Sequence, residues 1–239
     1  MKIEFHKVTW YSKIFALALF ALLPFAGFVF GAWYGGLVTR INDTAIFESA
    51  RNQGNTALPA YYQNISEWQT ARRDDAGFSI AYPLDFVTND IYAQQPTAEW
   101  SVSTNGLPGT LVMTLTIPKV FEPQTNFNEA RLTVGRSGNA NAVSLCAVSP
   151  APGIPGSYAT ATINRVLFSV YHFSDAGAGN LYDTTSYRTV HNGQCYAVEY
   201  TIHSSQIANY PSEYHLQPFD AGRLKQVLNR IVETFRFTN

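Results

Sequence analysis

The feature that most constrains this sequence is a long segment without charge. No acidic or basic side chain occurs in residues 14–39, between Lys13 and Arg40, and most side chains there are apolar. A helix needs about 20 such residues to cross the hydrocarbon core of a bilayer, which is about 30 Å thick. The sequence therefore predicts a transmembrane helix over residues 14–38, preceded by a cytoplasmic tail at residues 1–13.

The flanks of this segment favour the same interpretation. The aromatic pairs Trp10-Tyr11 and Trp33-Tyr34 stand at its two ends, where amphipathic rings prefer the lipid head-group layer. Three lysines precede the segment and two arginines follow it, a bias that favours a cytoplasmic N-terminus. We therefore expect a single-pass protein of the cell membrane whose C-terminal domain is periplasmic or extracellular. A cleaved signal peptide is the alternative.

Three glycines in the predicted span, Gly27, Gly31 and Gly35, recur every four residues. This spacing places small residues on one helix face and lets a second helix backbone approach closely. Self-association of the membrane helix is one hypothesis. The other is that glycine is simply common in membrane helices.

Residues 39–76 are predicted to form a juxtamembrane stalk, and residues 77–239 the exported domain. Within the stalk, Pro59 suits the first position of a helix, and Tyr61, Ile65 and Trp68 follow at helical spacing. The charged residues 72–75 then mark a solvated boundary.

The exported domain has the two-residue periodicity of β-strands from Phe78 onward. Pro83 and Pro118 each end a run of apolar residues, as expected where a strand stops. The predicted strands are 78–82, 111–117, 130–134, 142–148, 163–173, 181–190 and 194–202.

Asn192-Gly193 separates the last two strands and is a strong signal for a two-residue hairpin turn. That turn pairs Arg188 with Ala197 and places Glu199 diagonally opposite Arg188, within reach of an ion pair. Such a pair contributes little if it is exposed. One face of the second strand is expected in the core: Tyr196, Val198, Tyr200 and Ile202.

The chain ends in a predicted amphipathic helix. Asp220 suits the N-cap, and Phe219 and Leu224 have the spacing of a hydrophobic staple. The apolar stripe consists of Leu224, Val227, Leu228, Ile231 and Phe235. Antiparallel strands with helices packed on them give an α+β domain, an antiparallel sheet covered by helices.

Cys146 and Cys195 are the two cysteines of the chain. Both lie in predicted strands on the exported side, where an oxidising compartment favours a disulfide. The alternative is two unrelated buried thiols.

Two stretches resemble the PsbP/Mog1-like domains. Residues 77–86, Gly-Phe-Ser-Ile-Ala-Tyr-Pro-Leu-Asp-Phe, are similar to the opening motif of that family, and residues 228–237 to its closing helix and last strand. The hairpin residues 193–196, Gly-Gln-Cys-Tyr, occur where the family has a similar strand. The resemblance implies an α/β/α sandwich and a non-catalytic accessory or binding role, and it transfers no site residue.

No motif for catalysis, for a metal or for a cofactor is found. The nucleophile elbow, the His-Glu-x-x-His pattern and the phosphate-binding glycine loop are absent from the sequence. Asp85, with Asn89 and Asp90, is interpreted as a turn because the calcium-loop pattern is missing. Four histidines lie in the C-terminal half, and His191 and His203 fall too far apart along their hairpin to share a metal.

Aromatic side chains suggest a ligand surface instead. Tyr210, Tyr214 and His215 form a cluster before the last helix. Exposed rings often mark a surface that binds proteins or glycans. The alternative is that these rings fold over the edge of the sheet.

The composition narrows the function further. The chain is 46% hydrophobic and 14% charged, which excludes a disordered protein, and its net charge of −1 argues against nucleic-acid binding. We expect a membrane-anchored extracytoplasmic domain that binds an unknown protein or glycan without catalysis. Two alternatives stay open: a hydrolase of envelope polymers, and a structural subunit of a membrane complex.

Overall fold

The computed structural model describes residues 10, 11, 13–17, 19, 20, 22, 23, 60–88, 96, 97, 107–148 and 156–238. The chain divides into two compact units, Met1–Asn55 and Thr56–Asn239. In the first unit the described residues are helical and their side chains are exposed. None of the helices in the described ranges has both the length and the apolar character that a membrane crossing requires. Most of the predicted span, with Gly27, Gly31 and Gly35, lies outside the described residues.

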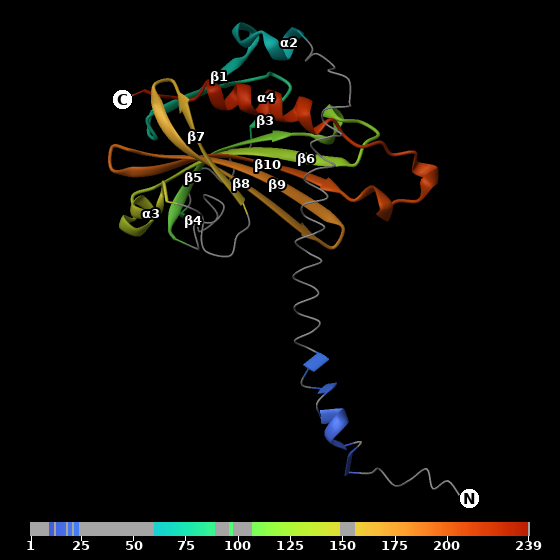
Figure 1. The fold of residues 1–239 in the computed structure, drawn as a ribbon. Coiled ribbons are helices and arrows are strands. Elements are labelled where there is room, and N and C mark those ends of the chain that lie inside the picture. Colours follow the sequence, from blue (N-terminus) through green and yellow to red (C-terminus); the bar gives the residue numbers. More distant parts are fainter. Residues whose placement is uncertain are drawn as a thin grey trace, which may run out of the picture. The chain divides into compact units, whose positions relative to one another are not determined.

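The second unit is built on a large antiparallel sheet (Figure 1). Its strands lie in the order β3-β5-β6-β10-β9-β8-β7, and β4 pairs with β5 beside this path. This arrangement confirms the predicted antiparallel sheet of an α+β domain. The strands are β3 (Val87–Thr88), β4 (Pro96–Thr97), β5 (Gly109–Ile117), β6 (Phe127–Ser137), β7 (Gly156–Ile163), β8 (Val166–Gly177), β9 (Asn180–His191) and β10 (Gln194–Ser205).

A second, three-stranded sheet was not predicted. It joins β1 (Gln69–Arg73), β2 (Phe78–Tyr82) and β11 (Arg236–Phe237), with β2 in the middle. The helix α2 (Ala60–Gln63) and the 3-10 turn η1 (Ile65–Glu67) precede β1, and Trp68 is buried in the core. The segment 60–73, expected in the stalk, is therefore part of the folded unit, and the packed region begins before Gly77.

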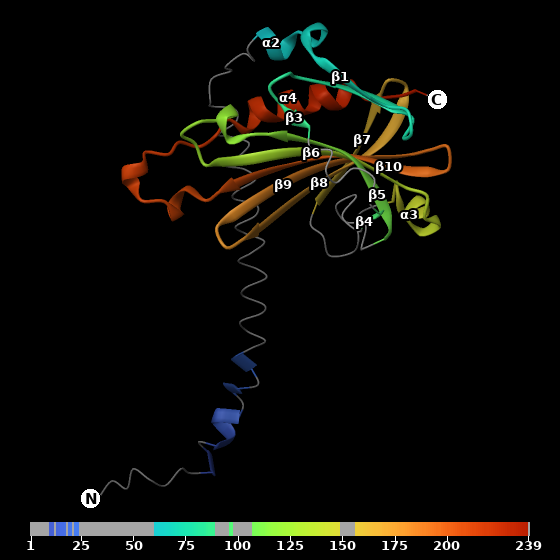
Figure 2. The same cartoon turned by 180° about the vertical axis from the view of Figure 1, so that it is seen from behind.

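The C-terminal helix α4 (Ala221–Glu233) begins and packs as predicted. The carboxylate of Asp220 accepts a hydrogen bond from the backbone N–H of Arg223 at 2.9 Å, which caps the helix. Leu224, Val227, Leu228 and Ile231 are buried in one core with side chains of both sheets. Helix α4 lies on the same side of the large sheet as α2 and β1 (Figures 1 and 2).

Polar contacts also join α4 to the sheet. The hydroxyls of Tyr187 and Tyr200 both donate to Oδ1 of Asn229, at 3.0 and 2.9 Å. Burial raises the pKa of both tyrosines above the ordinary value. Lys225 pairs with Asp183 of β9 at 2.5 Å.

The β9–β10 hairpin has the predicted register. Arg188 is opposite Ala197, and Val190 is opposite Cys195. Asn192 and Gly193 have φ angles of 48° and 72°, the left-handed conformation that a tight hairpin turn requires at both central residues. The predicted core side chains of β10, from Tyr196 to Ile202 at alternate positions, are all buried.

Two predicted strands differ from the structure. Residues 163–173 are divided between β7 and β8 by a turn at Asn164-Arg165, where Nδ2 of Asn164 donates to the carbonyls of Glu233 and Phe235. This tertiary contact fixes a turn that the local sequence does not signal. Residues 142–148 lie in and after a short helix, α3 (Ala140–Leu145), because the Asn139 side chain caps its first turn.

The second face of the large sheet carries α3 and the disulfide. Cys146, at the end of α3, is bonded to Cys195 of β10, with 5.6 Å between the Cα atoms. The predicted disulfide is thus present, although Cys146 caps a helix instead of lying in a strand. In the described region the only α-helix on this face is the short α3. The α/β/α sandwich was expected, but the sheet is covered by a long helix, α4, on one face only.

Removing the disulfide should destabilise the domain. The bond closes a loop with a sequence separation of 49, and the chain-entropy model assigns such a loop about 4 kcal/mol. We expect the double variant Cys146→Ala/Cys195→Ala to lose this amount in urea unfolding. Reductant should lower the midpoint of the wild type and leave that of the variant unchanged. Equal unfolding free energies for the oxidised wild type and the variant would contradict the prediction.

Candidate functional site

The candidate site is a pocket of about 290 Å³ formed by four separate segments. Pro83 ends β2, and the turn that follows carries Asp85 and Phe86, with the N–H of Phe86 bonded to the carbonyl of Pro83. Pro118 ends β5 and opens the 3-10 turn η3 (Lys119–Phe121). Helices α2 and α4 complete the walls. The lining residues are Tyr62, Asp85, Phe86, Pro118, Val120, Phe121 and Arg223.

Three aromatic rings of the pocket contact one another. The ring centroids of Tyr62 and Phe121 are 5.4 Å apart, those of Phe86 and Phe121 5.7 Å, and those of Tyr62 and Phe86 6.1 Å. Phe86 is buried, whereas Tyr62 and Phe121 are partly exposed. The three rings, called here the aromatic triangle, provide an apolar wall that solvent can reach.

Charged groups stand beside the aromatic triangle. The hydroxyl of Tyr62 donates to Oδ2 of Asp85 at 2.5 Å. The guanidinium of Arg223 forms an ion pair with the buried carboxylate of Glu122, and its Cζ atom lies 5.6 Å from the ring centroid of Phe121. Nε of Arg223 is shielded from solvent and has no hydrogen-bond partner among the described groups. The pocket therefore combines an apolar wall with one acceptor group and one donor group.

A second pocket, of about 390 Å³, is more open to solvent. Gln194 lines it, at the start of β10, and Oε1 of this residue is buried without a hydrogen-bond partner in the described region. Its other lining residues belong to the ends of β5 and β6: Pro108, Gly109, Thr110, Arg136, Ser137, Gly138 and Asn139.

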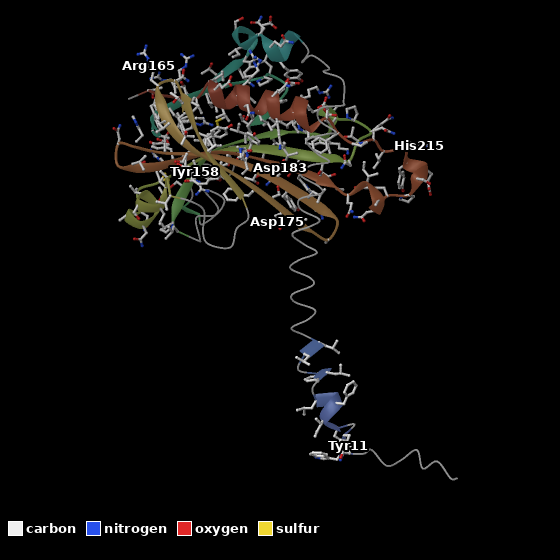
Figure 3. All side chains as sticks on the ribbon, viewed as in Figure 1. Tyr11, Tyr158, Arg165, Asp175, Asp183 and His215 are labelled. Atoms are coloured by element: carbon white, nitrogen blue, oxygen red, sulfur yellow. A yellow bond between two sulfur atoms is a disulfide. The ribbon has the colours of Figure 1, made fainter. Side chains whose placement is uncertain are left out.

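The aromatic cluster predicted from sequence lies elsewhere. Tyr210 directly follows the 3-10 turn η4 (Ile207–Asn209), and Tyr214 ends the turn η5 (Ser212–Tyr214). Their ring centroids are 6.5 Å apart. The side chain of Tyr214 is 63% exposed. Figure 3 shows His215 at the outer tip of the segment between β10 and α4, away from Asp183. The cluster lines neither pocket, and its role as a ligand surface stays a prediction.

The predicted ion pair between Arg188 and Glu199 is present, but it is buried. Their side chains are 5% and 3% exposed, with 3.5 Å between Nη2 and Oε2. Nε of Arg188 also donates to the hydroxyl of Ser186 at 2.8 Å, and its guanidinium lies 5.0 Å from the ring centroid of Tyr171. Burial raises the pKa of the Tyr171 hydroxyl, which donates to the carbonyl of Val148.

The histidines have separate structural environments. His203 stacks on Tyr182 with 4.6 Å between ring centroids, and His191 stacks on Phe237 at 3.7 Å. His172 contacts the hydroxyl of Thr185, and its pKa is lowered by burial and by Lys225. Within the described ranges, no three or more side chains of the metal-binding types come together.

Sequence reasoning missed the aromatic pocket. Its local signals were visible, because Pro83 and Pro118 each precede a short segment that contains a phenylalanine. Their meeting, however, depends on how β2, β5 and α4 pack, which neither motif reports.

Comparison with known proteins assigns no family to this chain. No family model matches the sequence, and no curated protein is similar to it. Among solved structures, the chain is similar to the solution structure of cyanobacterial PsbP (CyanoP) from Synechocystis sp. PCC 6803, with 10% identity and a TM-score of 0.35. That alignment covers 73% of this chain and 94% of the cyanobacterial chain. Membership of the PsbP/Mog1-like family stays a prediction.

Breaking the buried ion pair should be costly. Glu199→Ala leaves the Arg188 guanidinium buried without its carboxylate, which typically costs about 3–5 kcal/mol. We expect the double variant Arg188→Met/Glu199→Leu to be less destabilised than Glu199→Ala alone, because it buries no charge. Urea unfolding of the wild type and both variants measures this difference. A double variant that is less stable than Glu199→Ala would contradict it.

Proposed function

We propose that this chain is a membrane-tethered, non-catalytic binding domain whose ligand occupies the aromatic pocket. The observation that supports this proposal is the aromatic triangle beside Asp85 and Arg223. Pockets lined by apolar rings with a few well-placed polar groups are typical of ligand sites.

The polar groups of the pocket suit binding better than proton transfer. The Asp85 carboxylate accepts a hydrogen bond from Tyr62, and the Arg223 guanidinium is paired with Glu122. These contacts fix the orientation of both charged groups before a ligand arrives, which lowers the entropy cost of binding.

The hydrolase alternative depends on two carboxylates that face one cleft. Asp85 and Glu122 both stand near the pocket, but Glu122 is buried behind Arg223 and does not line the cavity. A general acid must reach the bond that it protonates, directly or through one water. Binding is therefore the better-supported proposal.

The tether is proposed from the sequence. The charge-free residues 14–39 are long enough to span a bilayer, and an aromatic pair stands near each end of this segment. The lysine bias favours a C-terminal unit outside the cytosol, where the Cys146–Cys195 bond would be stable.

The tether predicts two results in membranes. A chain anchored by residues 14–39 should stay in the membrane pellet after alkaline carbonate extraction and keep its full-length mass. An epitope tag added after Asn239 should be removed by protease supplied to intact cells or spheroplasts. Protection of the tag until lysis would contradict export, and a shortened, carbonate-soluble product would indicate a cleaved signal peptide.

The pocket predicts a local contact with the ligand in cells. Val120 lines the pocket and is 75% exposed, so we expect a benzophenone amino acid at this position to give a discrete covalent adduct on irradiation. Leu167 of β8 is 64% exposed and does not line the pocket, which makes it the matched control. Equal labelling at the two positions, or no adduct at Val120, would argue against the pocket as the binding site.

A further inference from the structure

We infer that the aromatic pocket binds a neutral sugar residue, held by ring stacking and by hydrogen bonds to Asp85 and Arg223. This inference depends on the proposed function, because it names the ligand class of the same pocket. Three properties of the pocket carry it: its charge, its apolar wall and its size.

The charges of the pocket disfavour an ionic ligand. The Arg223 guanidinium already lies over the Phe121 ring, so a cationic ligand would meet a positive charge at the ring face that it needs. An anion would meet the carboxylate of Asp85 in the wall, with the buried carboxylate of Glu122 behind Arg223. Repulsion between a ligand charge and a like charge of the pocket wall disfavours binding. The ligand that fits is therefore uncharged.

A purely apolar ligand is also disfavoured. It would remove water from Asp85 and Arg223 without replacing the lost hydrogen bonds, and burying unpaired polar groups costs free energy. Of the four lone-pair sites of a carboxylate, the Tyr62 hydroxyl occupies one on Asp85. The remaining sites can accept from ligand hydroxyls. The Nε–H of Arg223 is shielded from solvent, but those N–H groups of its two terminal nitrogens that are not bound by Glu122 can donate to ligand oxygens.

A sugar ring combines the two required surfaces. Its C–H face is apolar and packs against aromatic rings, and its hydroxyls both donate and accept at the ring edge. The aromatic triangle offers the apolar wall, and Asp85 and Arg223 offer an acceptor and a donor beside it. A volume of about 290 Å³ is at the lower limit for small-molecule sites, which suits one sugar unit or the end of a glycan.

The test is a titration of the full-length chain in a polyoxyethylene detergent, whose head group is neither a sugar nor an ion. The probes are the methyl glycosides of glucose, galactose, mannose and N-acetylglucosamine. Their binding is measured by saturation-transfer NMR and by calorimetry. Choline, acetate and cyclohexanol represent the cationic, anionic and apolar classes. We expect at least one of the four glycosides to bind in the millimolar range. Choline, acetate and cyclohexanol should not bind.

Matched variants locate the sugar. Phe121→Leu keeps an apolar side chain but removes the stacking ring, and Asp85→Asn removes the charged acceptor while retaining an oxygen for Tyr62. We expect each to weaken glycoside binding roughly fivefold to tenfold, the effect of losing one aromatic or charge-assisted contact. Tyr158→Leu replaces an exposed tyrosine of β7 that does not line the pocket and should leave binding unchanged. Circular dichroism confirms that each variant is folded.

The outcomes separate the two proposals. Binding of choline, acetate or cyclohexanol in place of every glycoside would overturn the sugar class and leave the pocket as a binding site. A Val120 adduct without glycoside binding would do the same. If no probe binds and Val120 gives no adduct, both proposals fail. Glycoside binding that Phe121→Leu and Asp85→Asn leave unchanged would move the sugar to another surface and overturn the inference.

Discussion

The register of the β9–β10 hairpin is the constraint on which the rest of the domain depends. The Asn192-Gly193 turn fixes it, because both residues adopt the left-handed conformation that a two-residue turn needs. Alternate residues of β10 then face opposite sides of the sheet, and a slip of one position would exchange the two faces. In the observed register, Tyr196 and Tyr200 enter the core that also contains the apolar face of α4, while Cys195 and Glu199 occupy the other face.

Cys195 and Glu199 of β10 are buried on the sheet face that carries α3, and each of them has a partner there. Cys195 is bonded to the end of α3, and Glu199 pairs with Arg188, whose guanidinium also contacts Ser186. A buried charge pair is weak evidence for stability, since desolvation offsets much of the attraction. Here the pair favours the observed register over a slipped one, because a slipped register would bury Arg188 and Glu199 apart from each other, at a large cost in free energy. The ion pair and the disulfide therefore reinforce the register that the turn establishes.

Sequence predicted the parts of this fold that local signals determine. The hairpin, the cap at Asp220 and the pairing of Cys146 with Cys195 each follow from a turn dipeptide, a capping residue or an even cysteine count. Sequence patterns failed to predict the structure where contacts between residues far apart in the chain determine it. The turn at Asn164 is held by the carbonyls of Glu233, the last residue of α4, and Phe235, and the three-stranded sheet needs β11 to return beside β2. The aromatic pocket is missed for the same reason, because its rings come from segments that only the tertiary fold brings together.

Helix α4 connects the core to the pocket. One face of the helix buries Leu224, Val227 and Ile231, while Arg223 and Lys225 on its flanks reach Glu122 and Asp183. The same helix thus closes the core and places the pocket guanidinium. Because Arg223 is held at its backbone by the Asp220 cap and at its side chain by Glu122, its position depends on no ligand contact. The pocket is thus preorganised, and a ligand of the kind proposed would meet a fixed order of ring, acceptor and donor around one cavity.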